Sequence, residues 1–471
     1  MSSDTQRLSV QEKVGYSLGD LSANLVFQTL MTFLAFFYTD VFKIPPASAA
    51  AVMLVGGILG ATFNLVMGAI ADRTVTRWGK FRPWVLWTAV PFGISAFLAF
   101  STPDLGESGK VAYAFFTYLL LVIMYSANNL PYSALSGVMT GDMNERNSLS
   151  SYRFVAVMVA QFITQVLLLP MVLYLGAGDQ PAGFKMAIGI FAVVSVVCFV
   201  ITFLTTRERI VPTPEQKSTV SQDLGDLVRN RPWVVMLALT ILVFITLALK
   251  GGSYIYYFRN YLDQGSLRLF LTQWGLAGDA GSDYASTAFS VFNAGGIIFM
   301  IVGIMFSKPL AGRFGKRDVF GWGLFASALF VLALYFMPPQ AVALVVLAQI
   351  LHGFFYGITI PLLWAMIADV ADYSEWKNNR RATAIIFSAM IFGLKVGLSI
   401  GGALLGSLLA MSGYDSNLKV QTPEAVEGIR RLVSIYPTLF FVAACGLLFF
   451  YEINKHKETQ IEQELAQRRA K

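Results

Sequence analysis

Charge, cysteine and histidine are all scarce in this sequence of 471 residues. Only 13% of the residues are charged, against roughly 25% in an average soluble domain, whereas 56% are hydrophobic and the mean hydropathy is +0.61. The two cysteines, Cys198 and Cys445, both lie in long apolar runs, so neither a disulfide framework nor a CxxC metal site is indicated. Neither the HExxH metalloprotease motif nor the phosphate-binding loop of nucleotide hydrolases occurs. The composition predicts a membrane protein that is not an enzyme and that needs no metal or other cofactor.

Long apolar runs occupy almost the whole chain. Most of them contain the roughly 20 residues that a helix needs to cross a ~30 Å hydrocarbon core. The runs are residues 20–42, 47–70, 84–101, 111–140, 151–175, 184–206, 233–258, 287–307, 319–337, 342–370, 384–410 and 432–453. They predict an all-α polytopic membrane protein with twelve transmembrane helices. We expect a six-helix half at 1–206, a central cytoplasmic loop at 207–232, a second six-helix half at 233–453 and a cytoplasmic tail at 454–471.

Basic residues gather in alternate loops. With both termini in the cytoplasm, the inner loops hold the clusters at 73–82, 207–231, 308–317 and 377–381, and the outer loops hold more scattered basic residues. The positive-inside rule therefore predicts cytoplasmic termini in an inner membrane. The same distribution accounts for a net charge of +7 without a nucleic-acid ligand. We expect a monomer in a lipid bilayer. We also expect no cleavable signal, because the first apolar run is long and further spans follow it directly.

An internal repeat relates the two halves. The stretch Arg77-Trp78-Gly79-Lys80 recurs 236 residues later as Arg313-Phe314-Gly315-Lys316, and Asn129-Leu130-Pro131 has a counterpart in Thr359-Ile360-Pro361. Two homologous six-helix halves are the major-facilitator arrangement, whose solute site lies between the halves near mid-depth of the membrane.

Lys395 stands in the middle of the apolar run 384–410. A charge at that depth costs at least roughly 2.5–3.5 kcal/mol, so it faces protein or water and not lipid. Lys395 then lies either on a solute pathway or in a quiet contact inside the bundle. The other ionisable and amide side chains within the runs are Asp20, Asn24, Gln28, Asn64, Asn128, Asn129, Arg153, Gln161, Gln165, Lys250, Asn293, Gln349 and His352. Amides can also simply bond helix to helix, and we expect His352 to be a packing histidine.

Aromatic side chains could hold a sugar, whose C–H faces stack on flat rings. The candidates lie in the runs 111–140, 233–258 and 342–370 and are Tyr125, Tyr132, Tyr254, Tyr257, Tyr356 and Trp364. At 14% aromatic content, many of these rings will only pack or lie at the membrane interface.

Several motifs resemble, in order and spacing, the glycoside–pentoside–hexuronide:cation symporter family, a major-facilitator family that includes melibiose permease. The matching stretches are Gly15–Asp20 (GYSLGD), Phe37–Asp40 (FYTD), Arg77–Trp84 (RWGKFRPW), Asn129–Tyr132 (NLPY), Ala368–Trp376 (ADVADYSEW) and Lys395–Leu398 (KVGL). They extend over nearly the whole chain. The resemblance implies a secondary transporter that moves a sugar, glycoside or hexuronide by alternating access.

The resemblance also implies roles for single residues. Family members couple sugar entry to Na⁺, Li⁺ or H⁺ through two aspartates of the second helix, and the matching positions here are Gly60 and Asn64. The family's sugar-holding acids fall on Asn24 and Asn129, while its helix-five arginine and helix-eleven lysine are kept as Arg153 and Lys395.

A site with Arg153 and Lys395 but no close carboxylate would be positive. It would disfavour Na⁺ and favour an anionic solute such as a hexuronide, whereas a neutral glycoside held by amides also fits. The predicted substrate-binding residues are Asn24, Tyr125, Asn129, Arg153, Trp364 and Lys395. The predicted coupling residues are Asp20, Asn64 and Lys395.

Transport is expected to be independent of Na⁺. It is then coupled to H⁺ through another acid such as Asp20, or it is uncoupled; the third alternative is a Na⁺ site built elsewhere in the protein. A cytoplasmic gate is expected from ion pairs between two sets of charged residues, Arg77, Lys80 and Arg82 in one half and Asp369, Asp372 and Glu375 in the other, unless these charges only anchor the topology. Two other functions fit the same architecture: transport of a lipid or lysolipid, and sensing without transport.

Overall fold

The structure, a computed structural model, describes residues 7–140, 143–209, 230–277, 283–378 and 383–469. The chain divides into two compact units, Met1–Glu215 with Asp415–Lys419 and Gln216–Tyr414 with Val420–Lys471. Throughout the described residues the secondary structure is helical apart from one isolated bridge between Thr76 and Gly79. Most of the predicted central loop, at residues 210–229, lies outside the described residues, so that boundary stays a prediction.

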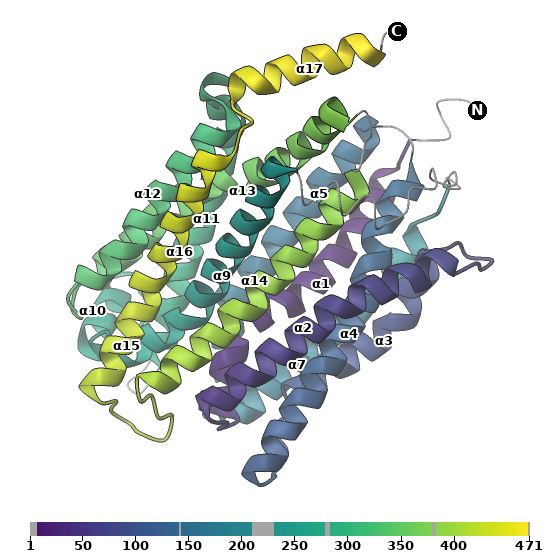
Figure 1. The fold of residues 1–471 in the computed structure, drawn as a ribbon. Helices are drawn as coiled ribbons and strands as arrows, with labels where there is room; N and C mark the ends of the chain where they lie inside the picture. Colours follow the sequence, from purple (N-terminus) through teal and green to yellow (C-terminus); the bar gives the residue numbers. More distant parts are fainter. Residues whose placement is uncertain (1–6, 141–142, 210–229, 278–282, 379–382, 470–471) are drawn as a thin grey trace. The chain divides into compact units, whose positions relative to one another are not determined.

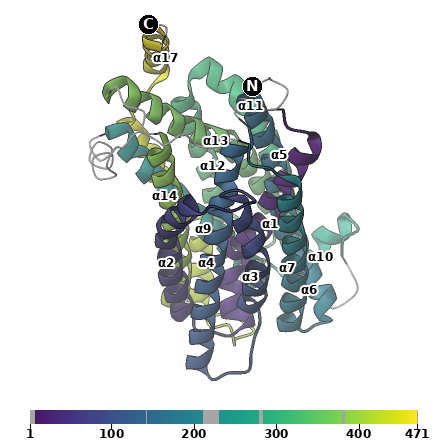
Figure 2. The ribbon, with the colours of Figure 1, turned by 90° about the vertical axis from the view of Figure 1, so that its right-hand side faces the viewer.

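The first unit is built on long helices that lie side by side (Figure 2). α2 and α3 both contact α4, and α1 contacts α5 and α7. The elements are α1 (Val10–Phe36), η2 (Phe37–Val41), α2 (Pro46–Arg73), α3 (Arg82–Ala99), α4 (Glu107–Met139), α5 (Met143–Phe162), η3 (Ile163–Leu167), α6 (Leu168–Gly176) and α7 (Gln180–Thr205).

The second unit repeats this plan and adds three helices that lie mainly outside the predicted apolar runs, α10, α15 and α17 (Figure 1). α10 follows α9 along the chain, and α17 is the polar helix at the carboxyl end. The elements are α9 (Arg231–Asn260), α10 (Gln264–Gln273), α11 (Tyr284–Phe314), α12 (Lys316–Phe336), α13 (Val342–Asn378), α14 (Thr383–Met411), α15 (Pro423–Val433), α16 (Ile435–Leu447), η4 (Leu448–Phe450) and α17 (Lys455–Arg469).

Eleven helical segments of the described chain are long and apolar enough to cross a membrane. Each coincides with one of the predicted runs. The remaining run, 84–101, also forms a helix, but α3 has only 18 residues, begins at a charged Arg82 and is not among the eleven. The all-α, multi-pass architecture is therefore confirmed, with eleven segments in place of twelve meeting the criteria of length and hydropathy.

α1 begins ten residues before the first predicted run, at a polar start. Ser9 Oγ accepts a hydrogen bond from the backbone N–H of Glu12 at 3.2 Å, and Glu12 Oε2 accepts one from the backbone N–H of Ser9 at 3.0 Å. This capping box satisfies two backbone donors at the helix start. Beyond the cap, Lys13 Nζ pairs with Glu145 Oε2 at 2.9 Å, which ties the first turns of α1 to α5.

Glycines allow helices of the second unit to approach closely. A side chain at Gly401 of α14 would meet the Cβ of Ala248 and the carbonyl oxygen of Ile245 in α9 at 2.6 Å each. Gly397, one turn earlier, would place a Cβ 2.6 Å from the carbonyl oxygen of Ile241. Small residues one turn apart are a common way to pack helices in a membrane. The glycines after Lys395 therefore allow a close approach of α14 to α9.

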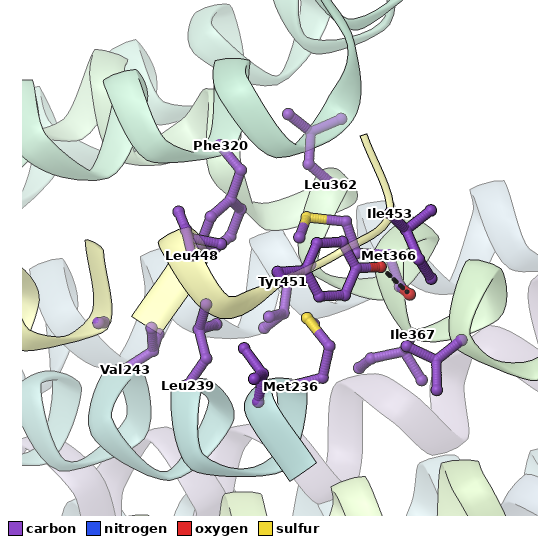
Figure 3. Close-up of a cluster of buried hydrophobic side chains, with 14 of the residues drawn as sticks. Met236, Leu239, Val243, Phe320, Leu362, Met366, Ile367, Leu448, Tyr451 and Ile453 are labelled. Carbon is purple, nitrogen blue, oxygen red and sulfur yellow. Dashed lines mark hydrogen bonds between the residues drawn. The ribbon is translucent and has the colours of Figure 1, made fainter. Parts of the chain in front are cut away.

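The core of the second unit is a cluster of buried apolar side chains from α9, α12, α13 and the end of the chain (Figure 3). Met236, Phe320 and Met366 are among its fully buried members. The hydroxyl of Tyr451 donates a hydrogen bond to the carbonyl oxygen of Met366 at 3.2 Å. Ile461 of α17 belongs to the same cluster, so the carboxyl-terminal helix is packed onto the bundle and not detached from it.

Candidate functional site

Arg153 of α5 and Asp20 of α1 form an ion pair inside the first unit. Arg153 Nε lies 2.5 Å from Asp20 Oδ2, and Arg153 Nη2 lies 3.4 Å from Asp20 Oδ1. The side chain of Asp20 is 7% exposed and that of Arg153 is 29% exposed. A site in which Arg153 has no close carboxylate was expected from the sequence. That expectation is wrong, because Asp20 balances the charge of Arg153.

Two stacked tyrosines hold this ion pair. The rings of Tyr16 in α1 and Tyr132 in α4 lie 4.5 Å apart, and each hydroxyl lies 2.7 Å from the backbone carbonyl oxygen of the other residue. The Tyr132 hydroxyl is also 3.0 Å from Asp20 Oδ2, and the Arg153 guanidinium lies 5.6 Å from both ring centres. Gly19 leaves room for the ring of Tyr132, which a side chain there would meet. Tyr16 was not among the predicted site residues, although it lies one helical turn before Asp20 on the same face.

Amide side chains extend the polar face of α1 away from the ion pair. Asn24 Nδ2 donates to the backbone carbonyl oxygen of Asp20 at 2.9 Å. One turn further on, Gln28 Oε1 accepts from Gln165 Nε2 at 3.3 Å. Gln165 lies in η3, a π-helical segment that interrupts the fifth span. Local π-helical turns are frequent at functional sites.

α4 presents its predicted residues on the same side as Tyr132. Tyr125, Asn129 and Tyr132 are spaced by four and three residues, which places them on one face of the helix. The ring centre of Tyr125 lies 5.9 Å from that of Phe27, on α1. Asn128, by contrast, donates from Nδ2 to Thr88 Oγ1 of α3 at 2.8 Å. Of the neighbouring amides, Asn128 therefore links two helices and Asn129 lies on the face of the candidate site.

The positions that match the family's cation-binding aspartates lie on α2. A Cβ at Gly60 would come within 3.0 Å of the Cβ of Val122 in α4, and closer still to one of its methyl groups, so this position serves helix packing. Asn64 donates from Nδ2 to the carbonyl oxygen of Ala61 at 3.4 Å. No group of three or more His, Cys, Asp or Glu side chains that could hold a metal ion occurs in the described part of the chain.

Trp364 and Lys395 belong to the second unit. Trp364 of α13 is 39% exposed. Lys395 is partly buried on α14, where its carbonyl oxygen accepts from Ser399 Oγ at 2.9 Å. Because Gly397 faces α9 and lies two residues further along the helix, Lys395 is on nearly the opposite side of α14. That Lys395 and Trp364 bind the same substrate as Arg153 stays a prediction.

Two of the charged residues expected to form the cytoplasmic gate, Asp369 and Arg82, have partners within their own units. In the second unit Lys316 Nζ lies 2.6 Å from Asp369 Oδ1 and 2.7 Å from Glu458 Oε1. In the first unit the Arg82 guanidinium donates from Nε to the carbonyl oxygen of Phe203 at 2.7 Å. Lys316 is the counterpart of Lys80 in the internal repeat.

Backbone contacts also hold the first of the repeated loops. The carboxylate of Glu208 accepts from the backbone N–H groups of Lys80, Phe81 and Arg82 at 2.8, 2.7 and 2.8 Å. A carboxylate at the start of a helix satisfies its free N–H groups and the positive end of its dipole. Ion pairs from Arg77, Lys80 and Arg82 to Asp369, Asp372 and Glu375 stay a prediction.

Comparison with known proteins shows the family. Residues 15–278 and 283–455 match the family described as MFS/sugar transport protein. The chain belongs to this family. It is 36% identical to the inner membrane symporter YicJ of Escherichia coli (strain K12) over 98% of this chain and 95% of that protein. It is 30% identical to the isoprimeverose transporter of Lactiplantibacillus pentosus over 98% of this chain and 92% of that protein. The glucuronide carrier protein homolog of Escherichia coli (strain K12) is 28% identical over 98% of this chain and 97% of that protein.

Solved structures show the fold. A D-xylose-proton symporter aligns with a TM-score of 0.62 at 14% identity, covering 94% of this chain and 97% of the other. The nucleoside transporter NupG aligns with a TM-score of 0.59 at 15% identity, covering 94% and 100%. The chain therefore is a multi-pass membrane transporter with the major-facilitator fold, and not an enzyme.

Proposed function

We propose that this protein carries a sugar or glycoside across the inner membrane by alternating access, with both termini in the cytoplasm. The observation that carries the proposal is the Asp20–Arg153 ion pair on the polar face of α1, α4 and α5. Within the described residues, Nη1 of Arg153 has no hydrogen-bond partner, so one guanidinium nitrogen is left to donate to a solute. Planar donors beside a carboxylate suit vicinal hydroxyl groups.

Charge balance favours a neutral, hydroxyl-rich solute. Asp20 neutralises Arg153, so this half of the site offers both a donor fork and an acceptor carboxylate. Asn129 adds an amide that can donate and accept, and Tyr125 adds a ring for a C–H face. An anionic hexuronide would need a further cation, for which Lys395 of the second unit is the candidate. Two relatives, an isoprimeverose transporter and a glucuronide carrier homolog, are named for one solute of each kind.

We infer that transport does not use Na⁺. Hard cations prefer anionic oxygen ligands, and the two matching positions hold Gly60, which packs on Val122, and Asn64, which is neutral. Asp20 is the acid on the polar face that could replace the family's two aspartates, but it already forms an ion pair with Arg153. Coupling to H⁺, or transport without coupling, therefore fits the described contacts better than Na⁺ symport.

Uptake into proteoliposomes tests the proposal. The purified protein would be offered labelled neutral glycosides, pentoses, hexuronides and lysophospholipids in separate reactions. We expect saturable uptake of at least one sugar, which unlabelled sugar competes for. Uptake confined to the lysophospholipid would replace the proposal with lipid transport. Saturable sugar binding without uptake in any reaction would indicate a sensor.

A further inference from the structure

Lys250 and His352 form a buried pair of basic side chains in the second unit. Lys250 belongs to α9 and is 8% exposed, and His352 belongs to α13 and is 2% exposed. Lys250 Nζ contacts His352 Nε2. The other ring nitrogen, Nδ1, lies 2.7 Å from Ser327 Oγ and 3.1 Å from the carbonyl oxygen of Ser327, in α12. The expectation that His352 only packs among apolar side chains is therefore incomplete, because both of its nitrogens have polar partners.

The partners of His352 determine where its proton lies. A backbone carbonyl oxygen only accepts hydrogen bonds, so the contact with the Ser327 carbonyl oxygen favours a proton on Nδ1. Nε2 is then the bare nitrogen of a neutral ring and accepts from the Lys250 ammonium. Two bases in hydrogen-bond contact share one donor proton between them. A second proton would turn the contact into a repulsion between two cations.

Among the described residues, no acid contacts the pair that would compensate a second charge. The contacts from α9 and α13 are the phenol rings of Tyr254 and Tyr356, 6.0 and 5.4 Å from Lys250 Nζ. α16 contributes the ring of Phe441, and α12 contributes Ser327. Among the described residues no carboxylate pairs with Lys250 or His352, and α11 and α14 contribute no charged group to their contacts. Along α13 itself, Asp369 is 17 residues away, or roughly 25 Å.

We propose that Lys250 and His352 form a proton-binding site that couples H⁺ to solute transport. The inference rests on the proposed sugar transport and specifies its driving ion. In the conformation described here the pair carries one positive charge. When the transport cycle opens this position to water, Nε2 of His352 takes up one proton, the new N–H bond forms from its lone pair, and the Lys250–His352 hydrogen bond breaks. Return to the dry conformation releases that proton. Alternating access thereby gives the site two conformations with different proton affinities.

Nuclear magnetic resonance of ¹⁵N-labelled histidine tests the proton site without any sugar. The chain has only two histidines, so the variant His456→Gln leaves His352 as the one labelled ring. We expect a neutral ring with the proton on Nδ1 and a hydrogen-bonded Nε2 at neutral pH. Acidification should convert it to the imidazolium form. In Lys250→Met the Nε2 resonance should shift, and the ring should become charged at a different pH. A ring that stays neutral on acidification and is unaffected by Lys250→Met overturns the proposal.

Transport measurements separate the coupling from the carrier function. In proteoliposomes, accumulation driven by a pH gradient needs net proton movement, whereas exchange of labelled for unlabelled sugar does not. His352→Gln and Lys250→Met should reduce accumulation to the equilibrium level while exchange continues. The control Thr246→Val, one turn from Lys250 and bonded only to the Leu242 carbonyl oxygen, should accumulate like the parent protein.

Each other outcome has a definite meaning. Accumulation that persists in both variants overturns the proton site. A parent protein that exchanges sugar but never accumulates it under a pH gradient also overturns the proton site, and leaves the carrier function intact. A parent protein that exchanges no sugar removes the proposed function instead, and the histidine titration alone then decides whether this pair binds a proton.

Discussion

Arg153 Nε lies 2.5 Å from Asp20 Oδ2, although the two residues are 133 positions apart in the sequence. The pair joins α5 to α1 at the level where Tyr16 and Tyr132 stack. Because Asp20 is nearly fully buried and Arg153 is partly exposed, the guanidinium bridges the acid and the polar face that Asn24 continues. One ion pair therefore links helix packing to the proposed solute contact.

Replacement of Arg153 by Ala should weaken solute binding. Hydrogen bonds to charged groups contribute about 1.5–3 kcal/mol, which corresponds to roughly 10- to 150-fold in affinity. The measurement is equilibrium binding of the transported sugar to purified protein. Since the lone variant leaves Asp20 buried and unpaired, which costs about 3–5 kcal/mol in stability, the double variant Asp20→Asn/Arg153→Gln should be better folded but equally weak in binding.

A matched control comes from the second unit. Arg259 pairs with Asp283 at 2.9 Å near the carboxyl end of α9 and is not among the proposed solute-binding residues. Arg259→Gln removes a guanidinium of similar exposure and should leave the affinity for sugar unchanged. If Arg153→Ala binds the sugar as tightly as the parent protein does, Arg153 is not a solute ligand.

A Na⁺ gradient should not drive accumulation of the sugar. The matching positions of the family's cation site supply one side-chain amide at Asn64 and no side chain at Gly60, so no anionic cage is present there. The test is uptake into vesicles under an imposed Na⁺ gradient at equal pH and membrane potential. Uphill uptake that requires Na⁺ would contradict this prediction. Uptake that follows a pH gradient and disappears in Asp20→Asn would assign the proton to Asp20 instead of the Lys250–His352 pair.

The apolar runs predicted the helices well and their polar extensions poorly. A run of about 20 apolar residues forms a helix in a membrane, because a helix satisfies all of its backbone hydrogen bonds within the segment. This is why eleven of the predicted runs reappear as candidate spans. α1 starts at Val10 and not at residue 20, because its first turns are held by polar contacts such as Arg209 Nη2 to Glu12 Oε1 at 2.5 Å. Hydropathy carries no information about such contacts.

The sequence singled out two charged residues of the candidate site but not their pairing, and it did not single out Tyr16. Arg153 and Asp20 were both singled out as costly charges within apolar runs, but with separate roles in solute binding and coupling. Which polar residues meet depends on the rotation of each helix about its axis and on how closely α1 approaches α4. Gly19 permits that approach, and its effect on Tyr132 is visible only in three dimensions. Likewise, nothing in the sequence spacing relates Lys250 to His352.

Replacement of Gly357 by Ala should destabilise the second unit. A Cβ at this position of α13 would lie 2.9 Å from the carbonyl carbon of Met300 in α11 and even closer to its oxygen, and backbone atoms cannot move aside. Overpacking of this kind costs about 1–3 kcal/mol. Gly312→Ala is the control, because no atom lies within 4 Å of a Cβ there. In a Cys198→Ser background, reaction of partly buried Cys445 with a thiol-specific dye during heating reports unfolding of this unit. Equal melting temperatures of the two variants would contradict the close contact between α11 and α13.

α17 is held on the second unit by charge and by apolar contact together. Lys316 of α12 bridges Asp369 of α13 and Glu458 of α17. Glu464 accepts a hydrogen bond from Trp376 Nε1 at 2.6 Å. On the same side of α17, Ile461 and Leu465 are 3% and 4% exposed. The tail predicted from sequence as a cytoplasmic extension is thus a docked helix in this structure.

Removal of the apolar anchors should release α17, and acid should weaken its docking. The double variant Ile461→Ser/Leu465→Ser loses this buried apolar area. A spin label on exposed residue 467 should then become mobile in electron paramagnetic resonance. The control Gln463→Ser, on the exposed side of α17, should leave the spectrum unchanged.

The indole of Trp376 holds the pKa of Glu464 below its usual range. For a carboxyl group with a lowered pKa, the stabilisation is present at neutral pH and is lost as the pH falls through the folded-state value. The label should therefore stay immobile at neutral pH and gain mobility only in acid, and an equally mobile label at pH 7 in the parent protein would show that α17 is not docked.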